Sequence, residues 1–218
     1  MPMKHRKLQC AWLLLCLGAL IFPARAETAD SSGSPFIVDA WTSKDGLPQN
    51  SVISVIQTRD GYLWLGTLNG LVRFDGIHFT VFNEYNTPGL NSDRIVYLFE
   101  DSHTNLWVGT DTAGVALVQD GKVKSLELGR VGYEGRLVSA CEDATGAVWL
   151  YTADARLGRY RDGKLEILNF NLPPAICRMI VAEKSGTLWI GEDWGLFSFR
   201  PANFHPPALP LDQNLRAK

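Results

Sequence analysis

Residues 58–67 read Thr58-Arg59-Asp60-Gly61-Tyr62-Leu63-Trp64-Leu65-Gly66-Thr67, and variants of this stretch return three more times along the chain. The tryptophans at the centres of the four copies, Trp64, Trp107, Trp149 and Trp189, follow one another at nearly equal intervals. The shared template is acidic-x-x-Gly-x-Leu-Trp-aliphatic-Gly-Thr. The third copy departs from it most, with Tyr151 in place of the second glycine.

A period of about 40 residues is typical of a β-propeller, in which each repeat forms one blade of four short antiparallel strands. The first repeat divides in this way. Apolar and polar residues alternate over 51–57, and three more short runs follow at 63–67, 71–74 and 78–82. Asx-Gly pairs separate the runs as hairpin turns. The sequence predicts an all-β propeller of four-stranded antiparallel blades, with repeats at about 48–83, 90–128, 134–169 and 174–200.

The two ends of the repeat region carry further information. Residues 36–41 read as a lone strand, of the kind that commonly completes the last blade of a closed propeller. Residues 201–218 are rich in proline and predict a linker or a disordered tail. An open set of four blades exposes the faces of its two terminal blades. We expect an incomplete, open propeller that self-associates or lacks its remaining blades; a closed four-bladed ring is the alternative.

The repeated tryptophans and glycines are interpreted as structural. A packing residue recurs in every blade, whereas a ligand contact is needed only once. The indole ring fills the wedge between neighbouring blades, and the glycine two positions later allows a close approach of the backbone. The predicted blade core consists of Trp64, Trp107, Trp149, Trp189, Gly66, Gly109 and Gly191.

The N-terminus has the three parts of a secretory signal: a basic head at residues 4–7, an apolar run at 11–22, and Ala24-Arg25-Ala26. The apolar run is short for a membrane span. We expect cleavage after Ala26, a short linker over 27–35, and a periplasmic or secreted chain. An uncleaved signal anchor is the alternative.

Charge and cysteine content narrow the possible partners. Without residues 1–26, which carry basic but no acidic side chains, the formal charge becomes −6 in place of −2, which argues against nucleic acid. Cys141 and Cys177 remain, and a single pair in an exported chain can form a disulfide. Because the two stand at different positions in their repeats, free buried thiols are the favoured interpretation.

No pattern in the sequence indicates an enzyme, a metal or a cofactor. His78, His103 and His205 are isolated from other ligands, and no nucleophile elbow, phosphate loop or dinucleotide fingerprint occurs. A glycosidase needs two carboxylates facing one sugar, and no pair stands out. Arg94, Arg136 and Arg178 form a conceivable cluster for an acidic sugar, so a carbohydrate-active propeller remains an alternative.

A binding site on one rim of the propeller is better supported. Arg94 and Arg136 occupy the same position ahead of the tryptophan in their repeats, at the start of the innermost strand of adjacent blades. Trp194 replaces the turn asparagine of the first repeat and is expected to be exposed, where its ring suits a sugar face. Asn69, Asp111, Tyr151, Asp193 and Trp194 are expected in the loops between the second and third strands of their blades. Together with Arg94 and Arg136 they are the predicted ligand-binding residues. Ordinary polar loop residues are the alternative for each.

The segment Asp45-Gly46-Leu47-Pro48-Gln49-Asn50-Ser51-Val52, followed by Leu63-Trp64-Leu65-Gly66-Thr67, resembles the two-component regulator propeller repeat. Leu90-Asn91-Ser92-Asp93-Arg94-Ile95 and Trp107-Val108-Gly109-Thr110 resemble it as well. The resemblance extends over about residues 36–200. It implies a periplasmic sensor domain of a hybrid histidine kinase or, in some members, of a diguanylate cyclase, with oligosaccharides or their breakdown products as ligands.

The resemblance also implies seven-bladed propellers followed by a β-sandwich, a membrane span and a cytoplasmic output domain. This chain has four repeats and none of those later segments. We therefore expect an N-terminal, non-catalytic sensing segment of a signalling protein, with any membrane contact made through an absent C-terminal part. A structural or protein-interaction propeller without a small ligand is the alternative.

Overall fold

The computed structural model describes residues 37–128, 135–168, 177–193 and 195–201, apart from the side chains of Cys177 and Arg178. The chain splits into two compact units, residues 1–40 and 41–218, and every strand lies in the second. None of the described residues belongs to a helix long and apolar enough to cross a membrane. The predicted signal peptide, the linker over 27–35 and residues 202–218 of the proline-rich tail lie outside the described residues.

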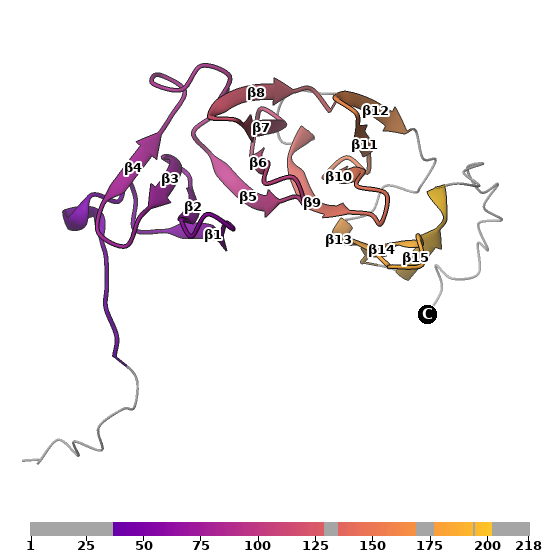
Figure 1. The fold of residues 1–218 in the computed structure, drawn as a ribbon, viewed down its shortest axis with the longest axis horizontal. Helices are drawn as coiled ribbons and strands as arrows, with labels where there is room; N and C mark the ends of the chain where they lie inside the picture. Colours follow the sequence, from indigo (N-terminus) through magenta and orange to yellow (C-terminus); the bar gives the residue numbers. More distant parts are fainter. Residues whose placement is uncertain (1–36, 129–134, 169–176, 194, 202–218) are drawn as a thin grey trace, which may run out of the picture. The chain divides into compact units, whose positions relative to one another are not determined.

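The strands form four antiparallel sheets in chain order, which we call blades 1 to 4 (Figure 1). Blade 1 contains β1 (Val52–Gln57), β2 (Leu63–Thr67), β3 (Gly70–Phe74) and β4 (Phe79–Phe82). Blade 2 contains β5 (Ile95–Glu100), β6 (Leu106–Thr110), β7 (Val115–Gln119) and β8 (Lys122–Leu126). Blade 3 contains β9 (Leu137–Glu142), β10 (Val148–Thr152), β11 (Leu157–Arg161) and β12 (Lys164–Leu168). Blade 4 contains β13 (Cys177–Ala182), β14 (Leu188–Glu192) and β15 (Gly195–Phe199).

The all-β propeller predicted from the repeat is thus confirmed. Blade 4 differs from the prediction because it has three strands, not four, among the described residues. Each blade presents two faces: the front face carries the repeat tryptophan, and the back face is the opposite one. On the ladder, Trp64 lies between Ile56 of β1 and Arg73 of β3. The same register recurs in blades 2 to 4.

The front face of each blade packs on the back face of the next, because alternate residues of a strand point to opposite faces. Trp64 of blade 1 shares a core with Ile95 and Leu98 of blade 2. Trp107 shares a core with Leu137 and Leu150 of blade 3. Trp149 shares one with Ile180, Leu188 and Ile190 of blade 4.

The tryptophan of blade 4 differs from the other three. Trp64, Trp107 and Trp149 are buried, whereas Trp189 is 37% exposed. Val181 and Leu196, on the same face of blade 4, are also exposed. The reason is that no further blade covers this face within the described residues.

Gly109 shows why the template has a glycine two positions after the tryptophan. A Cβ at this position would lie 2.8 Å from the Cβ of Leu137 on blade 3 and 2.9 Å from the Cβ of Tyr97. Real Cβ atoms do not approach so closely, so a larger residue here would force the two blades apart.

Residues 37–41 do not form the predicted N-terminal strand. They are exposed and pair with no strand of the described chain, and a strand needs a ladder partner for its backbone groups. A 3-10 helix at Ser43–Asp45 follows, capped by Thr42. Trp41 packs edge-on against Phe74 at 5.1 Å, and Leu47 is buried.

Cys141 is a free thiol, half-buried between blades 3 and 4. The side chain of Cys177, the other cysteine of the predicted mature chain, lies outside the described residues. Burial, together with the nearby charge of Asp143, raises the pKa of the Cys141 thiol to about 12. The thiol stays protonated at neutral pH, which makes it an inert packing residue rather than a nucleophile.

Candidate functional site

Two of the predicted arginines meet around one carboxylate. Arg94 lies just before β5, Asp111 just after β6, and Arg136 just before β9. The Arg94 side chain donates from Nε and Nη2 to Asp111 Oδ2 at 3.0 and 2.9 Å. Arg136 Nε lies 3.6 Å from Asp111 Oδ1. Adjacent blades 2 and 3 thus bring two guanidinium groups to the same acidic side chain, which we call the rim cluster.

Backbone contacts hold the rim cluster in place. The Asp111 amide donates to the Arg94 carbonyl at 2.8 Å, and the Ala153 amide donates to the Arg136 carbonyl at 2.9 Å. These bonds fix each arginine beside the loop that follows the second strand of its blade. The geometry therefore comes from backbone positions that recur from repeat to repeat.

The rim cluster holds two guanidinium groups, which are more exposed than the carboxylate between them. Asp111 is 15% exposed, whereas the Arg94 and Arg136 side chains are 48% and 34% exposed. A guanidinium has five N–H donors, and Asp111 engages two nitrogens of Arg94. The arrangement leaves Arg94 donors toward solvent, where they suit a carboxylate or the hydroxyl groups of a sugar.

Several polar residues that the sequence analysis did not select lie near these loops. Ser92 Oγ and Thr112 Oγ1 are 3.0 Å apart, and Ser92 Oγ accepts from the Arg94 amide at 3.3 Å. On blade 3, Arg156 Nε forms an ion pair with Asp154 Oδ2 at 2.9 Å. Thr112 and Asp154 lie in loops between the second and third strands of their blades. The same criterion selected Asp111, so it would have identified these two residues as well.

The remaining predicted ligand residues do not join the rim cluster in the same way. Asn69 is exposed at the β2–β3 turn, where its backbone N–H donates to Thr67 Oγ1 at 3.1 Å. Asp193 is exposed after β14. Trp194 and the side chain of Arg178 lie outside the described residues.

Tyr151 was wrongly placed in a loop by the sequence analysis. It is a residue of β10 and is fully buried, because its ring occupies the front face of blade 3 against blade 4. Its hydroxyl donates to Glu192 Oε1 at 2.8 Å. Glu192 itself replaces the template threonine, so two departures from the template are bonded to one another across the interface.

Glu192 is a buried carboxyl in unfavourable surroundings. Burial raises the pKa of Glu192, and the neighbouring charge of Asp193 adds to this effect, while the hydrogen bond from Tyr151 opposes it. Its second oxygen, Oε2, has no hydrogen-bond partner in the part of the chain that the structure describes. This pair belongs to the packing between blades 3 and 4 and not to the rim.

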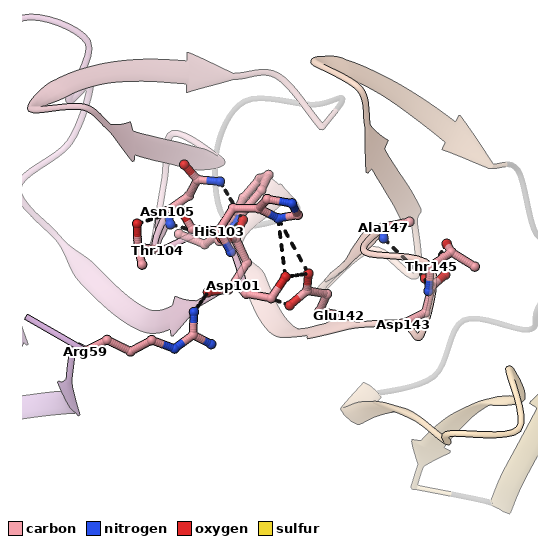
Figure 2. A network of polar contacts seen from close by, with 11 residues as sticks. Arg59, Asp101, His103, Thr104, Asn105, Glu142, Asp143, Thr145 and Ala147 are labelled. Atoms are coloured by element: carbon pink, nitrogen blue, oxygen red, sulfur yellow. Dashed lines mark hydrogen bonds and ion pairs between the residues drawn. The ribbon is translucent and has the colours of Figure 1, made fainter.

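The acidic residue that opens the template has a structural task, and Figure 2 shows Asp101 of blade 2 and Asp143 of blade 3 beside the turn residues that they bind. Asp101 Oδ1 accepts from the amides of His103 and Asn105 at 2.9 Å, and its Oδ2 accepts from Trp107 Nε1 at 2.9 Å. Asp143 likewise accepts from Trp149 Nε1 at 2.7 Å. The carboxylate thus closes the turn and fixes the indole.

A second acidic residue links the blades. The Arg59 amide of blade 1 donates to both carboxylate oxygens of Glu100 on blade 2, at 3.1 and 3.2 Å. The Ser102 amide of blade 2 donates to Glu142 Oε2 on blade 3 at 2.6 Å, and His103 Nδ1 lies 3.8 Å from Glu142 Oε1 (Figure 2). We call these two contacts the inter-blade clamps. Within the described residues no group of three or more His, Cys, Asp or Glu side chains could hold a metal ion.

Two segments of the chain match a known protein family. Residues 46–69 and 89–112 match the family described as "Two component regulator propeller". These two segments of the chain thus match the two-component regulator propeller repeat. The first matched segment covers β1 and β2 and ends at Asn69, and the second covers β5 and β6 with Arg94 and Asp111. The second match therefore includes two of the three residues of the rim cluster.

One curated relative is similar over part of the chain. The "Histidine kinase P4" of Formosa agariphila is 38% identical over 69 residues, which are 32% of this chain and 5% of that protein. The propeller repeats described here thus correspond to a small part of that relative.

Solved structures share the fold at low identity. The extracellular domain of a putative one component system from B. thetaiotaomicron is 24% identical, with a TM-score of 0.57 over 70% of this chain and 22% of that one. The extracellular domain of a putative hybrid two component system from the same organism is 21% identical, with a TM-score of 0.58 over 72% and 21%. Virginiamycin B lyase from Staphylococcus aureus is 17% identical, with a TM-score of 0.57 over 73% and 55%. This chain spans about one fifth of the length of the two extracellular domains.

Proposed function

We propose that this chain is a non-catalytic, ligand-sensing propeller segment of a two-component signalling protein, and that it acts in the periplasm. The observation that carries the proposal is the rim cluster. Arg94 and Arg136 come from adjacent blades and flank Asp111, and Arg94 and Asp111 lie within a matched two-component regulator propeller repeat.

The kinds of protein to which the relatives belong support this assignment. Two proteins with the same fold are extracellular domains of putative one-component and hybrid two-component systems, and the similar curated protein is a histidine kinase. In this proposal kinase or cyclase output, and any membrane contact, belong to parts of a longer parent protein.

The ligand class that fits the rim is an oligosaccharide or a related small periplasmic compound. Guanidinium groups donate in a fixed fork that suits carboxylates and vicinal hydroxyls. A ligand that bridges Arg94 and Arg136 contacts blades 2 and 3 together, and so it favours one arrangement of the two blades over others. That bias is the signal that an output domain would read.

Calorimetric titration of the full chain with trigalacturonate and with xylotriose tests the proposal. We expect binding of at least one glycan, and a loss of about tenfold or more in affinity for the double variant Arg94→Ala/Arg136→Ala. Arg161→Ala is the matched control, because Arg161 is an exposed arginine of blade 3 away from the rim.

Three outcomes contradict the proposal. Unchanged affinity in the double variant would place the binding elsewhere, and absence of binding by both glycans would favour the structural or protein-interaction alternative. Release of new reducing ends from either glycan would show that the chain is an enzyme.

A further inference from the structure

One position of the repeat, outside the ten-residue template, decides how well the wedge between two blades is filled. It lies on the third strand, directly opposite the residue that precedes the repeat tryptophan. In chain order this position holds Phe74, Val118, Tyr160 and Phe199. Its side chain is on the back face, so it points toward the tryptophan of the preceding blade.

Two of the three interfaces have an aromatic ring at this position. Tyr160 of blade 3 meets Trp107 of blade 2 edge-on, with ring centroids 4.9 Å apart. Phe199 of blade 4 meets Trp149 of blade 3 in the same manner at 6.0 Å. At the interface between blades 1 and 2 the position holds Val118, which has no ring to offer Trp64.

A cleft opens where that ring is missing. It has a volume of about 920 Å³, within the range of pockets for small ligands. Its walls include Trp64, Phe82 and Thr80 of blade 1, together with Val118 and Lys122 of blade 2. Arg73 also lines the cleft, and we call this space the wedge cleft.

Arg73 is a cation held by aromatic rings. Its guanidinium lies 4.6 Å from the centroid of the Tyr62 ring and 6.0 Å from that of Trp64. In the residues that the structure describes, it forms no hydrogen bond and no ion pair. The same position in blade 2 is Leu117, a buried core residue. A guanidinium stacked by its face leaves its N–H edge to bind a carboxylate in bidentate fashion.

Three carboxylates line the wedge cleft, those of Asp60, Glu100 and Asp120, and the first two are already engaged. Glu100 accepts the Arg59 amide in an inter-blade clamp. Asp60 accepts from Thr58 Oγ1 at 2.5 Å and from the Tyr62 amide at 3.3 Å. None of the three forms an ion pair with Arg73 among the described residues, so the charge of Arg73 remains for a ligand.

We propose that the wedge cleft binds a small aromatic carboxylate. The ring of the ligand takes the place that Tyr160 and Phe199 occupy at the other two interfaces, beside Trp64. The carboxylate of the ligand pairs with the N–H edge of Arg73. This site is distinct from the rim cluster, which lies between blades 2 and 3.

Titration of the full chain with phenylacetate, followed by calorimetry and by ligand-observed nuclear magnetic resonance, tests this site. We expect phenylacetate to bind, and its neutral amide, phenylacetamide, to bind at least about tenfold more weakly because it lacks the charge-assisted bonds. Arg73→Leu copies the residue of blade 2 and should lower phenylacetate affinity by a similar factor. Arg161→Leu, an exposed arginine of blade 3, is its matched control.

The decisive variant is Val118→Tyr, which copies blade 3. It should abolish phenylacetate binding while the melting temperature stays the same or rises, because the new ring fills the wedge. Arg136→Ala should leave phenylacetate binding unchanged. Undiminished binding in Val118→Tyr, equal affinity for acid and amide, or a preference for glucuronate over phenylacetate would each overturn the proposal.

Discussion

Glu192 is the residue whose surroundings suit a charge least. Because burial and Asp193 raise its pKa in the folded protein, the folded state binds more protons than the unfolded chain at intermediate pH. The contribution of Glu192 to the free energy of unfolding is therefore fully present below the ordinary pKa of a glutamate, and it is lost as pH rises through the raised pKa. Glu192→Gln keeps an oxygen for the Tyr151 hydroxyl and cannot ionise. We expect it to raise the melting temperature at pH 8 more than at pH 4, measured by circular dichroism.

The control for this prediction is Glu166→Gln, an exposed glutamate on β12 of blade 3. It should change the melting temperature little at either pH. An equal effect of Glu192→Gln at both pH values would show that folding does not raise the pKa of Glu192.

Asp143 is the opposite case. Burial works against its charge, but hydrogen bonds from Thr145, Trp149 and Ala147 outweigh that effect and lower the pKa of Asp143. Its contribution to stability is present at neutral pH and is lost as pH falls through the lowered pKa. Asp143→Ala leaves the buried Trp149 Nε1 without its acceptor, so we expect a loss of about 1–3 kcal/mol in urea unfolding at pH 7. Asp39→Ala, at an exposed residue outside the blades, should cost little.

At the scale of elements, the three interfaces have unequal polar contacts. Glu100 and Glu142 close the first two through the inter-blade clamps, while the same position in blade 4 is Ala182. Ala182→Glu would place a carboxylate opposite the exposed Ala144 turn of blade 3. We expect it to raise the free energy of unfolding by about 0.5–1.5 kcal/mol. Ala182→Leu controls for side-chain size, and a gain of equal size in that variant would show that the added bond is not the cause.

Most of the elements were predictable because each blade repeats the same local signals. Asx-Gly turns and short alternating runs specify a hairpin wherever they occur, so strands such as β2 and β6 follow from the sequence alone. The missing strand at residues 37–41 was not predictable in this way. A strand depends on a partner, and local alternation does not show whether a partner exists.

The site was predictable to a lesser extent for a similar reason. Arg94 and Arg136 could be placed together because they occupy the same position in adjacent repeats. Tyr151 replaces a template glycine, and the sequence alone suggested that the loop begins there. In the structure the pairing of β9 and β10 continues through Tyr151. The partner that holds it, Glu192, belongs to the next repeat of the sequence, and such pairings become visible only once the blades are packed.

At the scale of the whole molecule, exposed apolar side chains predict association. Val181, Trp189 and Leu196 lie on the uncovered front face of blade 4, and faces of this kind bury one another. We expect the chain to exceed its monomer mass of 24.2 kDa in light scattering at micromolar concentration. Leu196→Lys should shift it toward the monomer, whereas Ile77→Lys, at an exposed turn of blade 1, should not. A monomer at all concentrations would contradict this prediction.

The inter-blade clamps also determine where the protein opens first. Blade 2 is clamped on both sides, through Glu100 toward blade 1 and through Ser102 toward blade 3. Blade 4 has no such contact among the described residues, and its front face is bare. Stability in a repeat protein is a sum over nearest neighbours, so local unfolding should begin at blade 4 and reach blade 2 last. The backbone amides of β14 would then exchange with deuterated solvent well before those of β6, and the exchange pattern along the chain would record the order in which the blades separate.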